Sequence, residues 1–66
     1  MTANNPRRIL RLEAVKNLTG LGRTKIYDLM QQGRFPQGRR IADSRVTGWD
    51  SVEIEAWIAQ QLGKVA

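Results

Sequence analysis

Side chains that can hydrogen-bond to base edges or phosphates are concentrated in the segment 23–32. They are Arg23, Thr24, Lys25, Tyr27, Asp28 and Gln31. Lysine can donate to guanine O6 or N7, glutamine suits adenine, and aspartate accepts from cytosine N4. Ile26, Leu29 and Met30 recur between them at the i, i+3, i+4 spacing of an apolar helix face. We therefore expect a helix with one buried face and one face suited to nucleic acid, a pattern that a merely solvated helix also shows.

A second group of basic residues follows this segment. Its members are Arg34, Arg39, Arg40 and Arg45, with Arg8 near the N-terminus. The planar guanidinium group fits phosphate oxygens and guanine edges, and narrow minor grooves attract arginine. We expect these arginines to contact a nucleic-acid backbone. The alternative is a solvated hairpin whose charges protect its edges from aggregation.

The overall charge favours a polyanionic partner. Eleven Lys and Arg oppose six Asp and Glu, which gives a net charge of +5 and an isoelectric point near 10.8. Residues 50–62 contain acidic side chains but no Lys or Arg. Acidic groups at the start of a helix complement its dipole, which accounts for Asp50 and Glu53 but not for the missing basic residues. The sequence therefore predicts a molecule with a basic and an acidic side.

Hydrophobic spacing predicts two helices around a tight turn. The first covers about 13–18, with Leu12, Val15 and Leu18 on one side and Gly20 as a left-handed stop. The second covers about 23–32 and ends at a glycine cap, Gly33. A helix of about ten residues is roughly 15 Å long, enough to lie in a major groove.

A third helix is expected after residue 49. Asp50 and Glu53 have the spacing of a capping box, and Gly63 is the expected stop. Its apolar stripe consists of Ile54, Trp57, Ile58 and Leu62.

The helical period disappears between 37 and 49, where a hairpin is expected. Its arms are 39–41 and 46–49 and its tip is 42–45, although Gly48 weakens the second arm. The segment 9–12 is either a short strand or the lead-in to the first helix. The predicted fold is mostly α, a small winged helix-turn-helix with a short β-hairpin wing and a C-terminal helix. We expect a flexible basic arm at 1–8, the domain at 9–63 and a tail at 64–66.

The aromatic residues leave alternatives open. Tyr27 either packs its ring at the core edge or offers its hydroxyl to a phosphate. Trp49 and Trp57 are expected to pack in the core or between helices. Outside the tryptophans, Phe35 and Tyr27 are the candidates for stacking on single-stranded RNA. Two such residues are weak evidence for RNA binding.

Composition argues against catalysis and metal binding. The chain has no Cys and no His, so it lacks the usual zinc ligands, has neither residue as a nucleophile or general base, and cannot form disulfides. The run Gly20-Leu21-Gly22 lacks the Gly-Lys-Ser/Thr ending of a phosphate loop. We expect no enzyme activity, no cofactor, no membrane segment or signal peptide, and a cytoplasmic protein.

Several short runs together resemble the AlpA family of phage transcriptional regulators. They are Leu10-Arg11-Leu12, Leu18-Thr19-Gly20-Leu21, Thr24-Lys25-Ile26-Tyr27, Gly33-Arg34-Phe35-Pro36, Gly48-Trp49 and Ile54-Glu55-Ala56-Trp57-Ile58. This family is related to phage excisionases and to the MerR-like winged-helix class. The resemblance implies a DNA-binding regulator from a prophage or integrative element. Such a protein either activates genes or bends attachment-site DNA during excision.

The chain departs from the family pattern at three places. The family often has serine where Gly22 stands, proline near Gly38, and glycine within the tip 42–44. These departures concern the helix cap, the wing geometry and the DNA sequence preference.

The leading hypothesis is sequence-specific binding to double-stranded DNA by a transcriptional regulator. A module of this size has a small footprint, so we expect cooperative self-association on DNA. The first alternative is an excisionase-type directionality factor. An alternative of another class is a protein-interaction adaptor, which would hold its partner through Trp57 and the acidic third helix and would not bind DNA.

Overall fold

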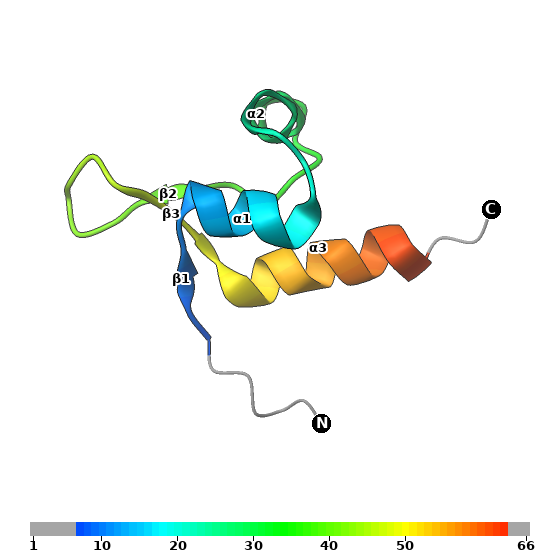
Figure 1. Ribbon diagram of the computed structural model, residues 1–66. Helices are drawn as coiled ribbons and strands as arrows, with labels where there is room; N and C mark the ends of the chain where they lie inside the picture. The colour runs from blue at the N-terminus through cyan, green and yellow to red at the C-terminus, as the bar shows by residue number, and fades with distance from the viewer. Residues whose placement is uncertain (1–6, 64–66) are drawn as a thin grey trace.

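The computed structural model describes residues 7–63, which form three helices and a small sheet (Figure 1). The order along the chain is β1 (Ile9–Leu10), α1 (Leu12–Thr19), α2 (Arg23–Gln31), β2 (Arg39–Arg40), β3 (Thr47–Asp50) and α3 (Ser51–Gly63). The predicted mostly helical, winged helix-turn-helix fold with a C-terminal helix is confirmed. The segment 1–6 of the expected arm and the tail 64–66 lie outside the described residues.

The sheet has the strand order β1-β3-β2, and both pairings are antiparallel. Leu10 pairs with Trp49 and Arg40 pairs with Thr47. Of the two alternatives for 9–12, the short strand is therefore confirmed at its first two residues. β3 is the central strand and leads directly into α3. The position of the wing relative to the C-terminal helix is therefore fixed by this continuous segment of backbone.

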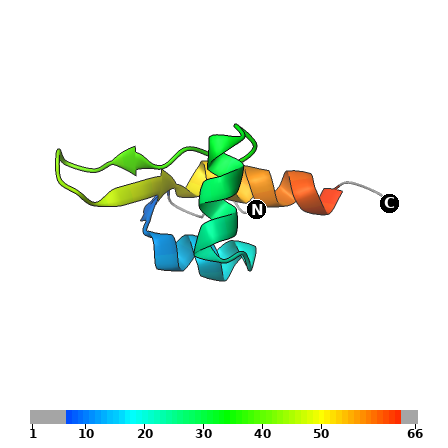
Figure 2. The ribbon, with the colours of Figure 1, turned by 90° about the horizontal axis from the view of Figure 1, so that it is seen from above.

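The hydrophobic core is contributed by nearly every element. Its buried members are Leu10, Val15, Ile26, Phe35, Trp49 and Ile54. Each helix places one fully buried aliphatic side chain in this core, as the helical spacing predicts. In Figure 2, α2 runs across the other two helices, while the hairpin extends to one side.

Two leucines assigned to apolar stripes do not join the core. Leu18 is 48% exposed and Leu62 is 80% exposed. Both lie near the C-terminal ends of their helices. The small core does not extend to these two positions, so the burial predicted from their helical spacing is wrong.

The beginning of α3 differs from the predicted capping box. Asp50 does cap the helix, because its Oδ1 accepts the backbone N–H of Val52 at 2.9 Å. Glu53 was expected to complete the box but instead accepts a hydrogen bond from Arg39 at 2.8 Å. The predicted stop, Gly63, is itself part of the helix.

Gly48 is a requirement of the sheet and not merely a weakness in its second arm. An added Cβ would lie 2.5 Å from Ile9 Cγ2 and 2.8 Å from Ile41 Cγ1. Ile9 and Ile41 therefore approach each other across the backbone of the central strand. No sequence pattern revealed this close approach, because the two isoleucines come from different segments.

We predict that Gly48→Ala destabilises the fold by about 1–3 kcal/mol, because overpacking forces backbone or side-chain shifts. Urea denaturation measures the effect. Gly63→Ala is the control: an added Cβ there has nothing within 4 Å and alanine favours the helix. Equal stabilities for the two variants would contradict the close approach at Gly48.

Candidate nucleic-acid interface

The turn before α2 is built by Thr19 and Gly20. Gly20 has a φ of +76° and its N–H donates to the carbonyl of Lys16 at 2.8 Å, which confirms the predicted left-handed stop. The Thr19 hydroxyl donates to the Val15 carbonyl at 2.8 Å and accepts from the Leu21 N–H at 3.2 Å. Because one hydroxyl joins both sides of the turn, the start of α2 has a defined position relative to α1.

The two ends of α2 are held differently. Its N-cap, Gly22, makes no side-chain cap hydrogen bond, as expected where a serine is missing. At the other end, Gly33 has a φ of +73° and its N–H donates to the Met30 carbonyl at 3.0 Å. The Arg34 N–H donates to the Leu29 carbonyl at 2.9 Å, which completes a Schellman motif and confirms the predicted glycine cap.

Both tryptophans fasten the segment that leaves α2. The indole N–H of Trp49 donates to the Pro36 carbonyl at 3.1 Å, and that of Trp57 donates to the Arg34 carbonyl at 2.9 Å. The Gln37 amide donates to the Met30 carbonyl at 2.9 Å. These three bonds set the angle between α2, the sheet and α3. The packing role predicted for the tryptophans is confirmed, whereas the role of Gln37 had no sequence signal.

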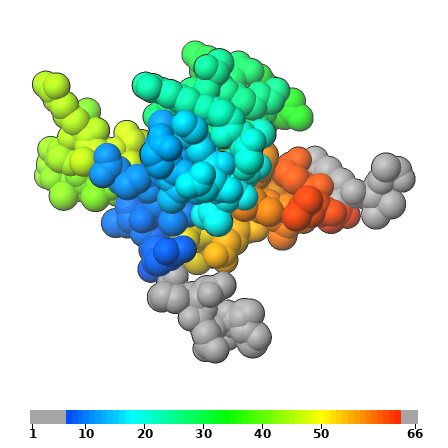
Figure 3. All heavy atoms as spheres, in the orientation of Figure 1, coloured from blue at the N-terminus to red at the C-terminus, as the bar shows by residue number. Residues whose placement is uncertain are grey.

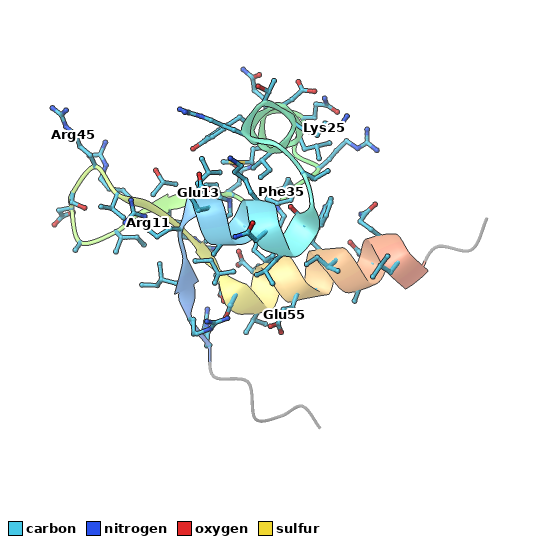
Figure 4. The ribbon with its side chains drawn as sticks, viewed as in Figure 1. Arg11, Glu13, Lys25, Phe35, Arg45 and Glu55 are labelled. Atoms are coloured by element: carbon cyan, nitrogen blue, oxygen red, sulfur yellow. The ribbon has the colours of Figure 1, made fainter. Side chains whose placement is uncertain are left out.

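Five of the six candidate residues on α2 line one shallow hollow. They are Arg23, Thr24, Tyr27, Asp28 and Gln31, joined by Met30 and Gln37. Lys25 is exposed but does not line this hollow. In Figure 4 it lies on the side of α2 remote from the wing, whose tip carries Arg45. The structure therefore presents two flanks of the helix, one with most of the predicted contacts and one with Lys25.

Three side chains of the hollow contact neighbouring side chains. Tyr27 is 39% exposed, and its ring packs edge-on against Trp49 with centroids 6.3 Å apart. The guanidinium of Arg23 lies 5.8 Å from the Tyr27 ring centroid, within the range of a cation–π contact. Asp28 accepts a hydrogen bond from the Gln32 amide at 3.1 Å, which orients its carboxylate.

The wing arginines project to opposite faces of the hairpin. Successive residues of a strand alternate between the two faces of a sheet. Arg40 is opposite Thr47, which shares a face with Trp49 and therefore with α2. Arg39 is opposite Gly48 and reaches Glu53 of α3 with its guanidinium. The structure thus brings Arg40, but not Arg39, to the side of α2.

The wing tip has an unusual backbone for its residues. Ala42 and Asp43 have φ values of 53° and 54°, a left-handed region that favours glycine. Ser44 closes the turn, because its N–H donates to the Ile41 carbonyl at 3.0 Å and its hydroxyl accepts from the Val46 N–H at 3.1 Å. Arg45 follows and extends outward from the tip (Figure 4).

The remaining candidates lie near the helix ends. Arg34 is exposed just after α2 and donates to Gln32 Oε1 at 3.4 Å. Arg8 exchanges backbone contacts with Ser51: its N–H donates to the serine hydroxyl at 2.7 Å, and its carbonyl accepts the Ser51 N–H at 2.9 Å. Arg8 therefore does not belong to a free arm, because its backbone is bound to the start of α3.

Arg7 forms an ion pair with the cap of α3. Its Nη2 lies 2.6 Å and its Nε 3.0 Å from Asp50 Oδ2, and the Asp50 side chain is only 7% exposed. The Arg7 hydrogen bonds, helped by the Val52 N–H, hold the pKa of Asp50 below its ordinary value of 3.8 against the opposing effect of burial. This pair joins the segment before β1 to the beginning of α3.

Comparison with families of known proteins matches residues 8–62 to the family described as Prophage CP4-57 regulatory protein (AlpA). The chain belongs to this family. The DNA-binding transcriptional activator AlpA of Escherichia coli (strain K12) is 38% identical over 60 residues, which cover 82% of this chain and 84% of that protein.

A second relative is the uncharacterized protein ORF88 of Enterobacteria phage P4. It is 36% identical over 55 residues, and the match covers 83% of this chain but 61% of that protein. No solved structure matches the chain. The resemblance to the AlpA family that the short sequence runs suggested is therefore confirmed.

Two further features concern the described residues 7–63. They contain no group of three or more His, Cys, Asp or Glu side chains that could hold a metal ion. None of their helices has the length and apolar character needed to cross a membrane.

We predict that the contribution of the Arg7–Asp50 pair to stability depends on pH. Because the pKa of Asp50 is lower in the folded than in the unfolded chain, the pair stabilises the fold above pH 3.8. This contribution is lost as the pH falls through the lowered pKa. Asp50→Asn retains a good N-cap but loses the ion pair, so it should be less stable than the parent protein at pH 7.

Urea denaturation at pH 7, 5 and 3 measures the difference. It should persist at pH 5 and shrink at pH 3. Arg7→Gln should lower stability in the same way, and the double variant should lose less than the sum of the single losses, because both changes break one pair. A difference that stays constant from pH 7 to pH 3 would contradict the assignment.

Proposed function

We propose that this chain is a sequence-specific double-stranded DNA-binding regulator of transcription in a prophage or mobile element. α2 enters the major groove, and the wing follows the neighbouring backbone. The proposed contacts from α2 come from Arg23, Thr24, Lys25, Tyr27, Asp28 and Gln31. Arg34, Arg40 and Arg45 are proposed to supply phosphate contacts, together with Arg8.

One observation carries this proposal. The exposed face of α2 and the Arg40 face of the wing lie on the same side of the sheet, whereas Arg7 is paired with Asp50 at the end of β3 and Arg39 with Glu53 of α3. Figure 3 shows α2 and the wing projecting from the body with a recess between them. A helix that enters a groove while a hairpin lies on the adjacent backbone requires this arrangement. The name of the E. coli relative agrees with it.

The adaptor hypothesis is less well supported than DNA binding. It depends on Trp57 as an anchor for a partner, but the Trp57 indole donates to the Arg34 carbonyl and its ring packs against Phe35 with centroids 4.8 Å apart. Trp57 is thus already engaged within the domain.

The mode of action also follows from the size of the module. A domain of 66 residues covers few base pairs, so we infer that it binds neighbouring sites cooperatively. Since its partner is genomic DNA, we place it in the cytoplasm. We also infer that it acts by binding and not by catalysis. A bent complex in permuted-fragment mobility experiments would favour the excisionase-type alternative.

We predict that two variants that each remove one positive charge affect DNA binding differently. Lys25→Ala should lower the preference for the specific site by about 1 kcal/mol or more, because the first turn of a recognition helix contacts bases. Arg40→Ala should weaken specific and unrelated duplexes by similar factors and reduce the salt slope by about one, as expected for a phosphate contact.

Fluorescence anisotropy with labelled duplexes from the flanking genome and with an unrelated duplex, at several salt concentrations, measures both effects. The equal charge change makes each variant the control for the other. If neither variant alters affinity, or if the parent protein binds no duplex even at low salt, the proposed function is wrong.

A further inference from the structure

The outer face of the sheet, opposite α2, carries a balanced charge network. Arg39 Nη2 lies 2.8 Å from Glu53 Oε2, and Arg7 Nη2 lies 2.6 Å from Asp50 Oδ2. Two cations are thus paired with two carboxylates. Since β3 runs directly into α3, these carboxylates lie at the point where the strand becomes a helix.

Glu53 is available for Arg39 because the helix does not need it as a cap. Asp50 alone accepts the Val52 N–H, so the Glu53 carboxylate can turn toward the wing. Arg39 is opposite a glycine in the register, and its side chain extends along the outer face to α3. The Glu53 hydrogen bond raises the pKa of the Arg39 guanidinium, in keeping with a well-formed pair.

Arg39 and Arg40 therefore have different electrostatic surroundings although they are adjacent in sequence. Arg40 has the opposite orientation, toward the side of α2. Without Glu53, the Arg39 side chain, which is 57% exposed and lies on the short strand β2 at the sheet's edge, would be long enough to turn toward a nearby phosphate. A phosphate contact of this kind strengthens binding to every sequence equally and so carries no sequence information.

We propose that Glu53 is a specificity-determining positioning residue that withholds Arg39 from the DNA backbone. It limits the sequence-independent affinity of the wing to the contacts of Arg40 and Arg45. This inference rests on the proposed function, because it concerns the ratio between specific and unspecific DNA binding.

The test compares Glu53→Gln with Glu55→Gln on an unrelated 20-base-pair duplex across a series of salt concentrations. Both changes remove one negative charge from the same helix, but within residues 7–63 only Glu53 is paired with a wing arginine. One released phosphate contact should raise the affinity of Glu53→Gln by about 5- to 10-fold at 0.1 M salt and increase the salt slope by about one. Glu55→Gln should raise the affinity by a smaller factor, because the lost charge acts on the DNA only at long range.

Two arginine variants complete the test. Arg39→Gln should weaken binding much less than Arg40→Gln, although both remove one charge. In Glu53→Gln/Arg39→Gln, the gain caused by Glu53→Gln should disappear. Thermal unfolding checks that all variants are folded. We expect them to be folded, because an exposed ion pair contributes little to stability.

Several outcomes would overturn the inference. Equal effects of Glu53→Gln and Glu55→Gln would show that Arg39 gains no contact. Equal losses for Arg39→Gln and Arg40→Gln would show that Arg39 already binds DNA in the parent protein. In both cases the proposed function would stand, provided that the parent protein binds the duplex and Arg40→Gln binds it more weakly. A parent protein that binds no duplex would overturn both.

Discussion

The orientation of α2 relative to the wing depends on the side chain of Trp49. This indole is 1% exposed, donates to the Pro36 carbonyl and supports the edge of Tyr27. Gly38 leaves room above it, since an added Cβ there would lie 3.0 Å from the Trp49 ring. Through its backbone, the same residue belongs to the central strand of the sheet. A chain with so small a core cannot distribute this task over many contacts, so a single aromatic residue joins α2, the wing and the first strand.

Strand alternation sorts the positive charge of the domain. Viewed as a sequence, α3 is an acidic element opposed to a basic remainder of the chain. In the folded protein, Asp50 and Glu53 are neutralised by Arg7 and Arg39, so the outer face of the sheet is balanced. Arg40, on the side of α2, and Arg45, at the wing tip, have no carboxylate partner among the described residues. The side opposite α2 is therefore less acidic than the sequence of α3 suggests, because two of its carboxylates are paired.

The wing tip shows how a turn can form without the usual glycine. Ala42 and Asp43 both adopt positive φ, which costs about 1–2 kcal/mol for a residue with a Cβ. Ser44 offsets part of this cost, because its hydroxyl donates to the Ile41 carbonyl and accepts the Val46 N–H. The tip thus keeps a tight turn and places Arg45 at its outer end.

The sequence by itself determined the three helices, their glycine ends at Gly20 and Gly33, and the two arms of the wing. These features follow from local spacing and backbone preference, which neighbouring residues encode. Only the tertiary structure decided that Glu53 pairs with Arg39 rather than with its own helix, that Gly48 lies beneath two isoleucines, and that Leu18 and Leu62 remain exposed. Each of these depends on distances between segments far apart in the chain. Periodicity predicts which face of an element is apolar, but the size and shape of the assembled core decide how far that face is covered.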